Sequence, residues 1–304
     1  MLCLSKFALY LPKVSTVAFF MKVPKNYMKI MNNKIRLCCF FSLFILPLCS
    51  SFSQKIDQVS QCEVNSFYSY SLQEERQYCV YLPPQYQKQQ QYPVVYFADG
   101  QEFMNCNYQQ LLDSLIDAKL INPVIAVGIF SNEKTVPTGH GVQSSSENIQ
   151  YRNLEYLEFW DIKDNFAVTL FENHLKFFVN EMLPYIENEY SISSDRKNRI
   201  FYGFSNGAVF GLSICTRFPQ LFSKYILFSP YGVTQSKIAS NKDYPTNFYI
   251  AFGTEEPDFI VKDAIESLEK SLKKSKNPYK IIIYEGGHEK LKWKKEFGNL
   301  MVSK

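Results

Sequence analysis

Runs of apolar residues recur between residues 64 and 284, and stretches with apolar side chains at helical spacing separate most of them. Short apolar runs of this kind are typical of strands buried on both faces of a sheet. The segments that predict strands are 64–70, 77–82, 93–98, 124–130, 199–204, 225–229, 247–252 and 279–284. A polar turn joins the first two, so we expect them to form an antiparallel hairpin.

Apolar residues three and four positions apart predict the helices between these strands. The expected helices are 101–119, 171–186, 209–217, 261–272 and 289–301. Strands that alternate with helices indicate an α/β fold, with a mostly parallel central sheet, helices on both faces and the antiparallel hairpin at an edge. Residues 131–168 are polar and aperiodic, and they are too many for a plain connection, so they predict a functional loop or lid.

An apolar run at 37–49 follows Lys29, Lys34 and Arg36 and precedes the small-x-small pattern of residues 51–53. These features predict a secretory signal peptide in residues 31–53. The run is too short for a permanent membrane anchor, so we expect an exported protein, periplasmic or extracellular, without stable membrane insertion. Met28 or Met31 is a more natural start, and residues 1–27 would then be an over-extended beginning of the 1–53 leader. Residues 54–304 contain no repeat or linker and are expected to form one domain.

The chain has 304 residues and a net charge of +4. This charge is too small to indicate nucleic-acid binding, and no basic cluster alternates with aromatic residues. Outside the leader, the cysteines are Cys62, Cys79, Cys106 and Cys215. Their spacing matches no metal site or disulfide framework, so we expect mostly free, buried thiols and neither a metal nor another cofactor.

The clearest chemical signal is Gly203-Phe204-Ser205-Asn206-Gly207, which follows the apolar run 199–204 and precedes a predicted helix. A serine on a tight turn from strand to helix is the arrangement of a nucleophile elbow. The flanking glycines leave room for that turn, and the turn exposes the hydroxyl of Ser205. A glycine-rich turn that only allows close packing is the alternative, and the order of the remaining residues decides between them.

Polar residues follow three other predicted strands: Asp99-Gly100, the segment 253–258, and the segment 285–288 that ends in His288. In parallel α/β sheets the chemistry lies at the carboxyl ends of strands. The chain order serine, acid, histidine is that of α/β hydrolases. His288 would take the proton of Ser205 and return it to the leaving group, and a carboxylate would orient the imidazole.

Glu256 is our first choice for that carboxylate, with Asp258 second and Glu255 third. These acids would alternatively complement the dipole of the following helix, and both roles are compatible. His288 would alternatively be a loop histidine held by backbone groups. His140 lies in the expected lid and His174 on an expected helix surface, so neither is well placed to act as the base.

The transition state of acyl transfer needs N–H donors aimed at the developing oxyanion. The amide of Asn206, at the start of the helix after the elbow, is one expected donor. The second is expected from Gly100, or from its neighbour Gln101, after the strand 93–98. An ordinary turn would explain Asp99-Gly100 equally well.

Six segments in order resemble the putative-esterase family, whose relatives include enterochelin esterases, feruloyl esterases and S-formylglutathione hydrolase. They are residues 80–86, 96–101, 152–156, 203–207, 253–257 and 286–288, the last with Trp293, and the resemblance spans roughly residues 60–302. It implies an α/β-hydrolase fold and carboxyl-ester hydrolysis, with the nucleophile at Ser205, the histidine at His288 and the acid at Glu256. Glutamate at the acid position is similar to the siderophore esterases, where feruloyl relatives commonly have aspartate.

Arg152 and Tyr156 lie in segment 152–156, which resembles a loop motif of the family. We expect both residues, together with Trp160, to contact the substrate. Arg152 would alternatively fix the lid by surface hydrogen bonds, and Trp160 would alternatively be packed. We therefore predict an exported serine esterase acting on a small siderophore-type, feruloyl or acetyl ester. The positive net charge weakly favours an anionic ester. The alternative is a non-catalytic binding protein with the same fold.

Overall fold

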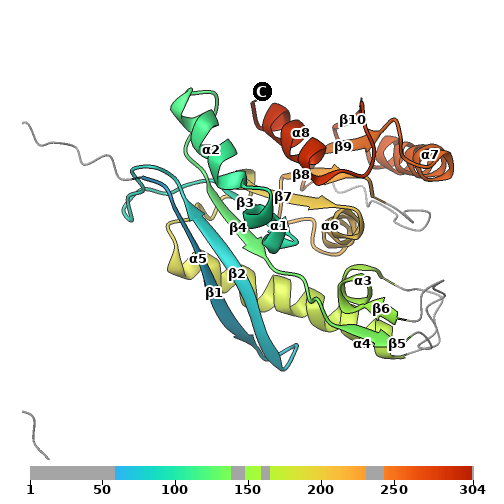
Figure 1. Ribbon diagram of the computed structural model, residues 1–304, viewed down its shortest axis with the longest axis horizontal. Coiled ribbons are helices and arrows are strands. Elements are labelled where there is room, and N and C mark those ends of the chain that lie inside the picture. The colour runs from blue at the N-terminus through green and yellow to red at the C-terminus, as the bar shows by residue number, and fades with distance from the viewer. Residues whose placement is uncertain (1–58, 138–147, 159–164, 231–242, 303–304) are drawn as a thin grey trace, which may run out of the picture. The chain divides into compact units, whose positions relative to one another are not determined.

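An eight-stranded sheet, in the order β1-β2-β4-β3-β7-β8-β9-β10, forms the centre of the computed structural model (Figure 1). The strands are β1 (Gln61–Ser69), β2 (Glu74–Leu82), β3 (Val94–Ala98), β4 (Ile125–Ile129), β7 (Arg199–Phe204), β8 (Lys224–Phe228), β9 (Asn247–Gly253) and β10 (Tyr279–Tyr284). β1 and β2 pair antiparallel at one edge, β2 pairs antiparallel with β4, and the remaining pairs are parallel. The predicted mostly parallel α/β sheet with an antiparallel hairpin is confirmed.

The structure describes residues 59–137, 148–158, 165–230 and 243–302, all of which belong to the compact unit Ile56–Lys304. The predicted signal peptide and the rest of the leader lie outside the described residues, as do Trp160 and His140. No helix in the described ranges is long and apolar enough to cross a membrane.

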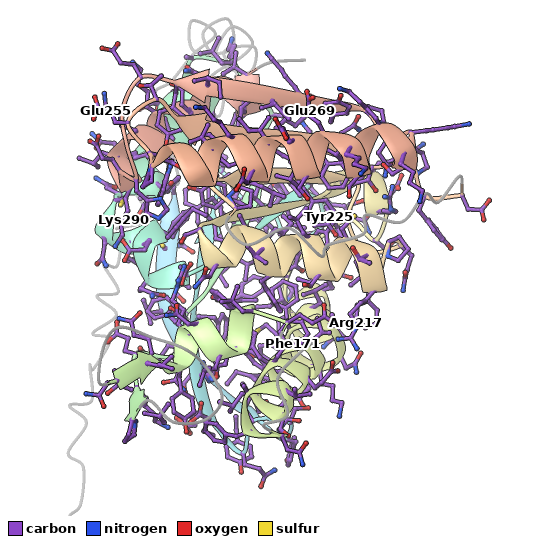
Figure 2. The ribbon with its side chains drawn as sticks, turned by 90° about the vertical axis from the view of Figure 1, so that its right-hand side faces the viewer. Phe171, Arg217, Tyr225, Glu255, Glu269 and Lys290 are labelled. Atoms are coloured by element: carbon purple, nitrogen blue, oxygen red, sulfur yellow. The ribbon has the colours of Figure 1, made fainter. Side chains whose placement is uncertain are left out.

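Helices cover both faces of the sheet, because strand residues alternate between two apolar layers. Val94 and Tyr96 of β3 join one layer, whereas Val95 and Phe97 join the other. The first layer contains residues of α4 (Asn165–Lys176), the π-helical turn η1 (Phe177–Met182), α5 (Leu183–Glu189), α6 (Asn206–Arg217) and α7 (Asp258–Ser275). The second contains residues of α1 (Gly100–Asn105), α2 (Tyr108–Asp117) and α8 (Lys290–Val302). Figure 2 looks onto the face covered by α6 and α7.

The single helix predicted over 101–119 is wrong, because the chain breaks it at Cys106 and Asn107. Asn107 adopts a left-handed conformation with φ 54°, and its side chain accepts a hydrogen bond from the amide of Gln110. Asparagine tolerates this conformation because its short side chain can bond locally. The break leaves α1 as a short helix that starts directly after Asp99.

The segment 131–168, expected to be an aperiodic loop, contains short strands and helices among its described residues. β5 (Thr135–Pro137) pairs with β6 (Asn148–Gln150), and α3 (Tyr151–Tyr156) follows at once. α3 packs against α4 and α6 and buries Leu154 and Tyr156. This part of the segment is therefore fixed to the core of the fold. Residues 138–147 and 159–164 lie outside the described residues.

The predicted surface position of His174 is wrong, since only 1% of the residue is exposed. His174 follows Phe171 by three positions and precedes Phe178 by four, so it lies on the inner face of the helix. Its ring packs against those of Tyr156 and Phe210. The four cysteines outside the leader are free, and all but Cys62 are buried, as predicted.

Candidate active site

Ser205 occupies a strained turn between β7 and α6. Its backbone angles are φ 53° and ψ −130°, a region that residues with a Cβ rarely adopt. The turn is so tight that a Cβ on Gly203 would lie 2.5 Å from the carbonyl oxygen of Gly207. The amide of Ser205 donates to the carbonyl of Phe228 in β8 at 2.7 Å, which fixes the turn to the neighbouring strand. The geometry is that of the elbow expected from the sequence, and Ser205 is half-buried at the wall of a cavity.

Glu256 follows β9 and is 4% exposed. One of its oxygens, Oε1, accepts hydrogen bonds from the hydroxyl of Ser229 and the amide of Gly253. The same oxygen lies 3.9 Å from Nδ1 of His288. Glu255 is exposed, and Pro257, the residue at the N-cap of α7, makes no side-chain capping hydrogen bond. Among the three acids considered, only Glu256 is placed against His288 by the contacts described. The side chain of Asp258 lies outside the described residues.

Ser229 is a site residue that sequence analysis missed. Segment 225–229 was expected to be strand throughout, but β8 ends at Phe228 and Ser229 leaves it with φ 48°. β8 lies between β7 and β9 in the sheet, so its carboxyl end falls between Ser205 and Glu256. The signal available in the sequence was a hydroxyl residue at the end of a further parallel strand.

His288 lies on the loop that follows β10. This loop packs backbone to backbone against the loop of Glu256, since a Cβ on Gly253 would lie 2.2 Å from the carbonyl oxygen of Gly286. Burial lowers the pKa of His288, Glu256 opposes this shift, and the positive charge of Arg152 adds to it. A histidine with a lowered pKa is mostly neutral at pH 7, and neutral imidazole is the form that accepts a proton.

Tyr284 and Trp293 pack against the loop that carries His288. The indole N–H of Trp293 donates to the hydroxyl oxygen of Tyr284 at 2.7 Å. That hydroxyl lies 2.9 Å from the carbonyl of Gly287 and 3.2 Å from Oε1 of Glu256, so its one proton has two acceptors. The ring of His288 packs edge-on against Trp293 with 4.6 Å between centroids. Trp293 itself is buried.

The two residues proposed to supply oxyanion donors begin helices at the same edge of the sheet. Asn206 is the first residue of α6 and Gly100 is the first residue of α1. The first amides of a helix have no intrahelical acceptor, so both are available to a bound oxygen. β3 and β7 are neighbours in the sheet, which places these helix starts next to each other. The amide of Gln101 lies in the same first turn and stays an alternative to Gly100.

A cavity of about 410 Å³ opens at Ser205. Its walls are formed by Asp99, Gln101, Glu102, Ser131, Asn132, Glu133, Gln150, Arg152, Phe204, Ser205, His288, Lys290 and Trp293. Arg152 lines the cavity as expected, but its guanidinium is bound to the Asp99 carboxylate through two hydrogen bonds of 2.5 and 2.7 Å. In the described ranges, no group of three or more His, Cys, Asp or Glu side chains is arranged to hold a metal ion.

The expectation that Tyr156 contacts substrate is not met by its position. Tyr156 is 1% exposed and does not line the cavity. Its ring stacks on Phe210, and its hydroxyl accepts a hydrogen bond from the amide of Asp99 at 3.1 Å. It faces inward because α3 buries this side of the helix against α4 and α6. Trp160, the third expected contact, lies outside the described residues.

Comparisons with known proteins found a matching family model and a curated relative. Residues 69–301 match the family model described as "Putative esterase". The chain is 23% identical over 240 residues to the uncharacterised protein YjcH of Bacillus subtilis (strain 168), an alignment that covers 75% of this chain and 90% of YjcH.

Several solved structures share the fold. A ferulic acid esterase superposes with a TM-score of 0.60 at 17% identity, covering 81% of this chain and 97% of the esterase. An IroE-like serine hydrolase from Shewanella oneidensis gives 0.59 at 19% identity, covering 79% and 80%. The enterobactin esterase FES from Shigella flexneri gives 0.58 at 15% identity, covering 80% of this chain and 58% of FES. At these identities the likeness shows the α/β-hydrolase fold.

Proposed function

Because the chain belongs to the Putative esterase family, we propose that it is a serine hydrolase that cleaves a small carboxyl ester through an acyl-enzyme. The observation that carries the proposal is that Ser205, Glu256 and His288 follow β7, β9 and β10 at the same end of the sheet. Ser205 and His288 line one cavity, and Glu256 lies 3.9 Å from His288. A protein that only binds a ligand has no need of a strained serine, a histidine and a buried carboxylate in this order.

In this mechanism Ser205 attacks the ester carbonyl while His288 takes its proton. The amides of Asn206 and Gly100 or Gln101 stabilise the negative charge that forms on the carbonyl oxygen. His288 then protonates the departing alcohol, and an acyl group stays on Ser205. Water, activated by His288, releases the acid in the second half of the reaction. Glu256 orients the imidazole and stabilises its charged form throughout.

The substrate we propose is a small ester with a feruloyl, siderophore-type or acetyl group. The cavity of about 410 Å³ is within the range of roughly 300–1,000 Å³ that small-molecule sites occupy. Phe204 and Trp293 provide an apolar wall beside Ser205 for the acyl group. The names of the structural neighbours, ferulic acid esterase and enterobactin esterase, support the same class.

Turnover of short-chain p-nitrophenyl esters by the wild type and by Ser205→Ala tests the proposal. We expect hydrolysis by the wild type, loss of activity to background in the variant, and an unchanged circular dichroism spectrum. A fluorophosphonate probe should label the wild type at Ser205. A wild type that is inert towards all esters and unlabelled by the probe would exclude the esterase and favour the non-catalytic binding protein.

We also propose that the protein is exported and cleaved near Gln54, on the strength of the signal-peptide pattern in residues 31–53. N-terminal sequencing of the protein recovered from cells expressing the full chain tests this. Recovery of a product that begins near Gln54 outside the cytoplasm is expected, and a full-length cytoplasmic product would contradict it.

A further inference from the structure

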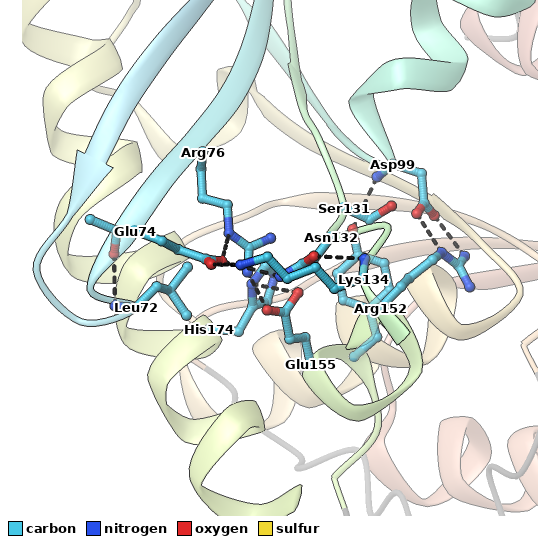
Figure 3. A network of polar contacts seen from close by, with 12 residues as sticks. Leu72, Glu74, Arg76, Asp99, Ser131, Asn132, Lys134, Arg152, Glu155 and His174 are labelled. Carbon is cyan, nitrogen blue, oxygen red and sulfur yellow. Dashed lines mark hydrogen bonds and ion pairs between the residues drawn. The ribbon is translucent and has the colours of Figure 1, made fainter. Parts of the chain in front are cut away.

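Three side chains of the short helix α3 contact the two backbone segments that carry the proposed oxyanion donors. Arg152 binds the carboxylate of Asp99 through two hydrogen bonds (Figure 3). The Tyr156 hydroxyl accepts a hydrogen bond from the backbone amide of Asp99. Asn153 accepts a hydrogen bond from the side-chain amide of Asn206 at 2.9 Å. One six-residue helix therefore contacts both Asp99, which precedes Gly100, and the first residue of α6.

We propose that α3 is the positioning element of the oxyanion hole, with Arg152 and Asn153 as its positioning residues. The inference rests on the proposed function and gives a new role to Arg152, which the sequence analysis assigned to substrate contact, and a first role to Asn153. The backbone of Asp99 is left-handed with φ 59°, a strained conformation that the surrounding contacts must stabilise. Asn206 follows the strained Ser205 directly, so its side-chain bond to Asn153 fixes the first peptide of α6.

The charge of Arg152 has a second consequence for the same site. The Asp99 side chain is 1% exposed, and a Cβ on Gly207 would lie 3.0 Å from its Oδ2, so the carboxylate lies against the first turn of α6. An unpaired carboxylate at this place would repel the negative charge of the transition state. Arg152 neutralises it, and its guanidinium is further held over the rings of Tyr156 and Phe204.

The α3 helix is in turn anchored deeper in the protein. Glu155, 1% exposed, is paired with the guanidinium of Arg76 on β2, and its other oxygen lies 3.7 Å from Nδ1 of His174 (Figure 3). Arg76 also forms an ion pair with Glu74 at 2.7 Å, and the exposed Lys134 forms an ion pair with the other carboxylate oxygen of Glu74. α3 is thus fixed to the sheet on one side while it holds the two donor segments on the other.

Variants of Asn153 separate positioning from a purely structural role. Asn153→Leu replaces the acceptor oxygen with a methyl group on a side chain of the same branching, whereas Asn153→Gln keeps a neutral amide oxygen that can accept from Asn206. With p-nitrophenyl acetate we expect Asn153→Leu to lower kcat by roughly 10- to 100-fold with little change in KM, since displacement of a catalytic group by about 1 Å can cost this much. Affinity for a trifluoromethyl ketone that forms a tetrahedral adduct should fall in parallel, and Asn153→Gln should keep most of the wild-type kcat.

Adding Asn206→Ala should have little further effect in the Asn153→Leu background, because both changes remove the same hydrogen bond. An Asn153→Leu protein with wild-type kcat, or an equal loss in Asn153→Gln, would overturn the proposal. So would additive losses in the double variant. Each of these outcomes assumes an active wild type, and an inert wild type would instead refute the proposed function itself.

Variants of the Arg152–Asp99 pair give a second, independent experiment. It also tests whether Arg152 binds the substrate directly. Arg152→Met leaves the buried carboxylate unpaired, so kcat should fall by at least about 100-fold, the scale of losing one oxyanion donor. Asp99→Asn removes that charge and tolerates the left-handed backbone. Arg152→Met with Asp99→Asn should therefore recover at least about 10-fold. If Arg152 instead binds substrate, KM rises and the second substitution recovers nothing, which would overturn the proposal.

Discussion

At the scale of single residues, the electrostatics of His288 lead to a prediction about pH. Burial and Arg152 lower its pKa, and Glu256 raises it. The activity of the free enzyme requires neutral His288, so kcat/KM should fall as the pH drops through that pKa, below the ordinary value of about 6.5. The side chain is 38% exposed, so solvent screens part of each contribution.

Glu256→Gln removes the group that raises this pKa. The acid limb of kcat/KM should therefore move to lower pH, while kcat falls by roughly 10²- to 10⁴-fold because the imidazolium loses its partner. Arg152→Met should move the limb the opposite way. Glu255→Gln, at the exposed neighbouring position, is the matched control and should leave the profile unchanged. An unshifted limb in Glu256→Gln, or a shifted one in Glu255→Gln, would mean that the acid has been misassigned.

At the scale of elements, the buried ion pair between Arg76 on β2 and Glu155 on α3 joins the edge hairpin to the helix that holds the active site. The two side chains are 5% and 1% exposed. Removing one partner of such a pair leaves a buried charge without compensation and typically costs about 3–5 kcal/mol, whereas replacing both with apolar residues is often neutral.

We expect Glu155→Leu to lower the free energy of unfolding by about 3–5 kcal/mol, and Arg76→Met with Glu155→Leu to recover most of this loss. In Glu155→Leu, Glu74 still partly neutralises the charge of Arg76, so we expect a loss of unfolding free energy near the lower end of this range. Urea unfolding followed by circular dichroism measures both. Lys273→Ala breaks an exposed pair within α7 and is the control expected to show no measurable change. A double variant as unstable as the single one would show that the two charges act separately.

At the scale of the whole molecule, the parts of the site that could be predicted are those set by chain order at strand ends. Ser205, Glu256 and His288 follow parallel strands, so the carboxyl ends of these strands bring them to the same end of the sheet. Ser229 was missed because a one-residue difference in the end of β8 decides whether its side chain belongs to the strand or the site. The role of α3 could not be predicted, since Arg152 and Asn153 find their partners through tertiary packing, with 53 residues separating each pair.

The net charge of the whole chain is a poor guide to the charge of the cavity. The protein carries +4, which alone would favour an anionic ester. Yet the two basic residues among the described cavity walls are both paired, Arg152 with Asp99 and Lys290 with Glu102 at 2.7 Å. Glu133 adds a further carboxylate at the rim. The described walls therefore favour a neutral acyl group over an anionic one.

We accordingly expect p-nitrophenyl acetate to have a kcat/KM at least about 10-fold above that of the singly charged p-nitrophenyl succinate, a difference equal to about 1.4 kcal/mol. The gap should narrow as salt rises from 0.01 to about 0.5 M, because exposed charges such as Glu133 are screened. Glu133→Gln should narrow it at low salt, and Glu269→Gln, which removes the same charge from α7, should not. p-Nitrophenyl butyrate controls for acyl length. A preference for the succinate that weakens with salt would show instead that the positive charge of the whole molecule dominates at the cavity.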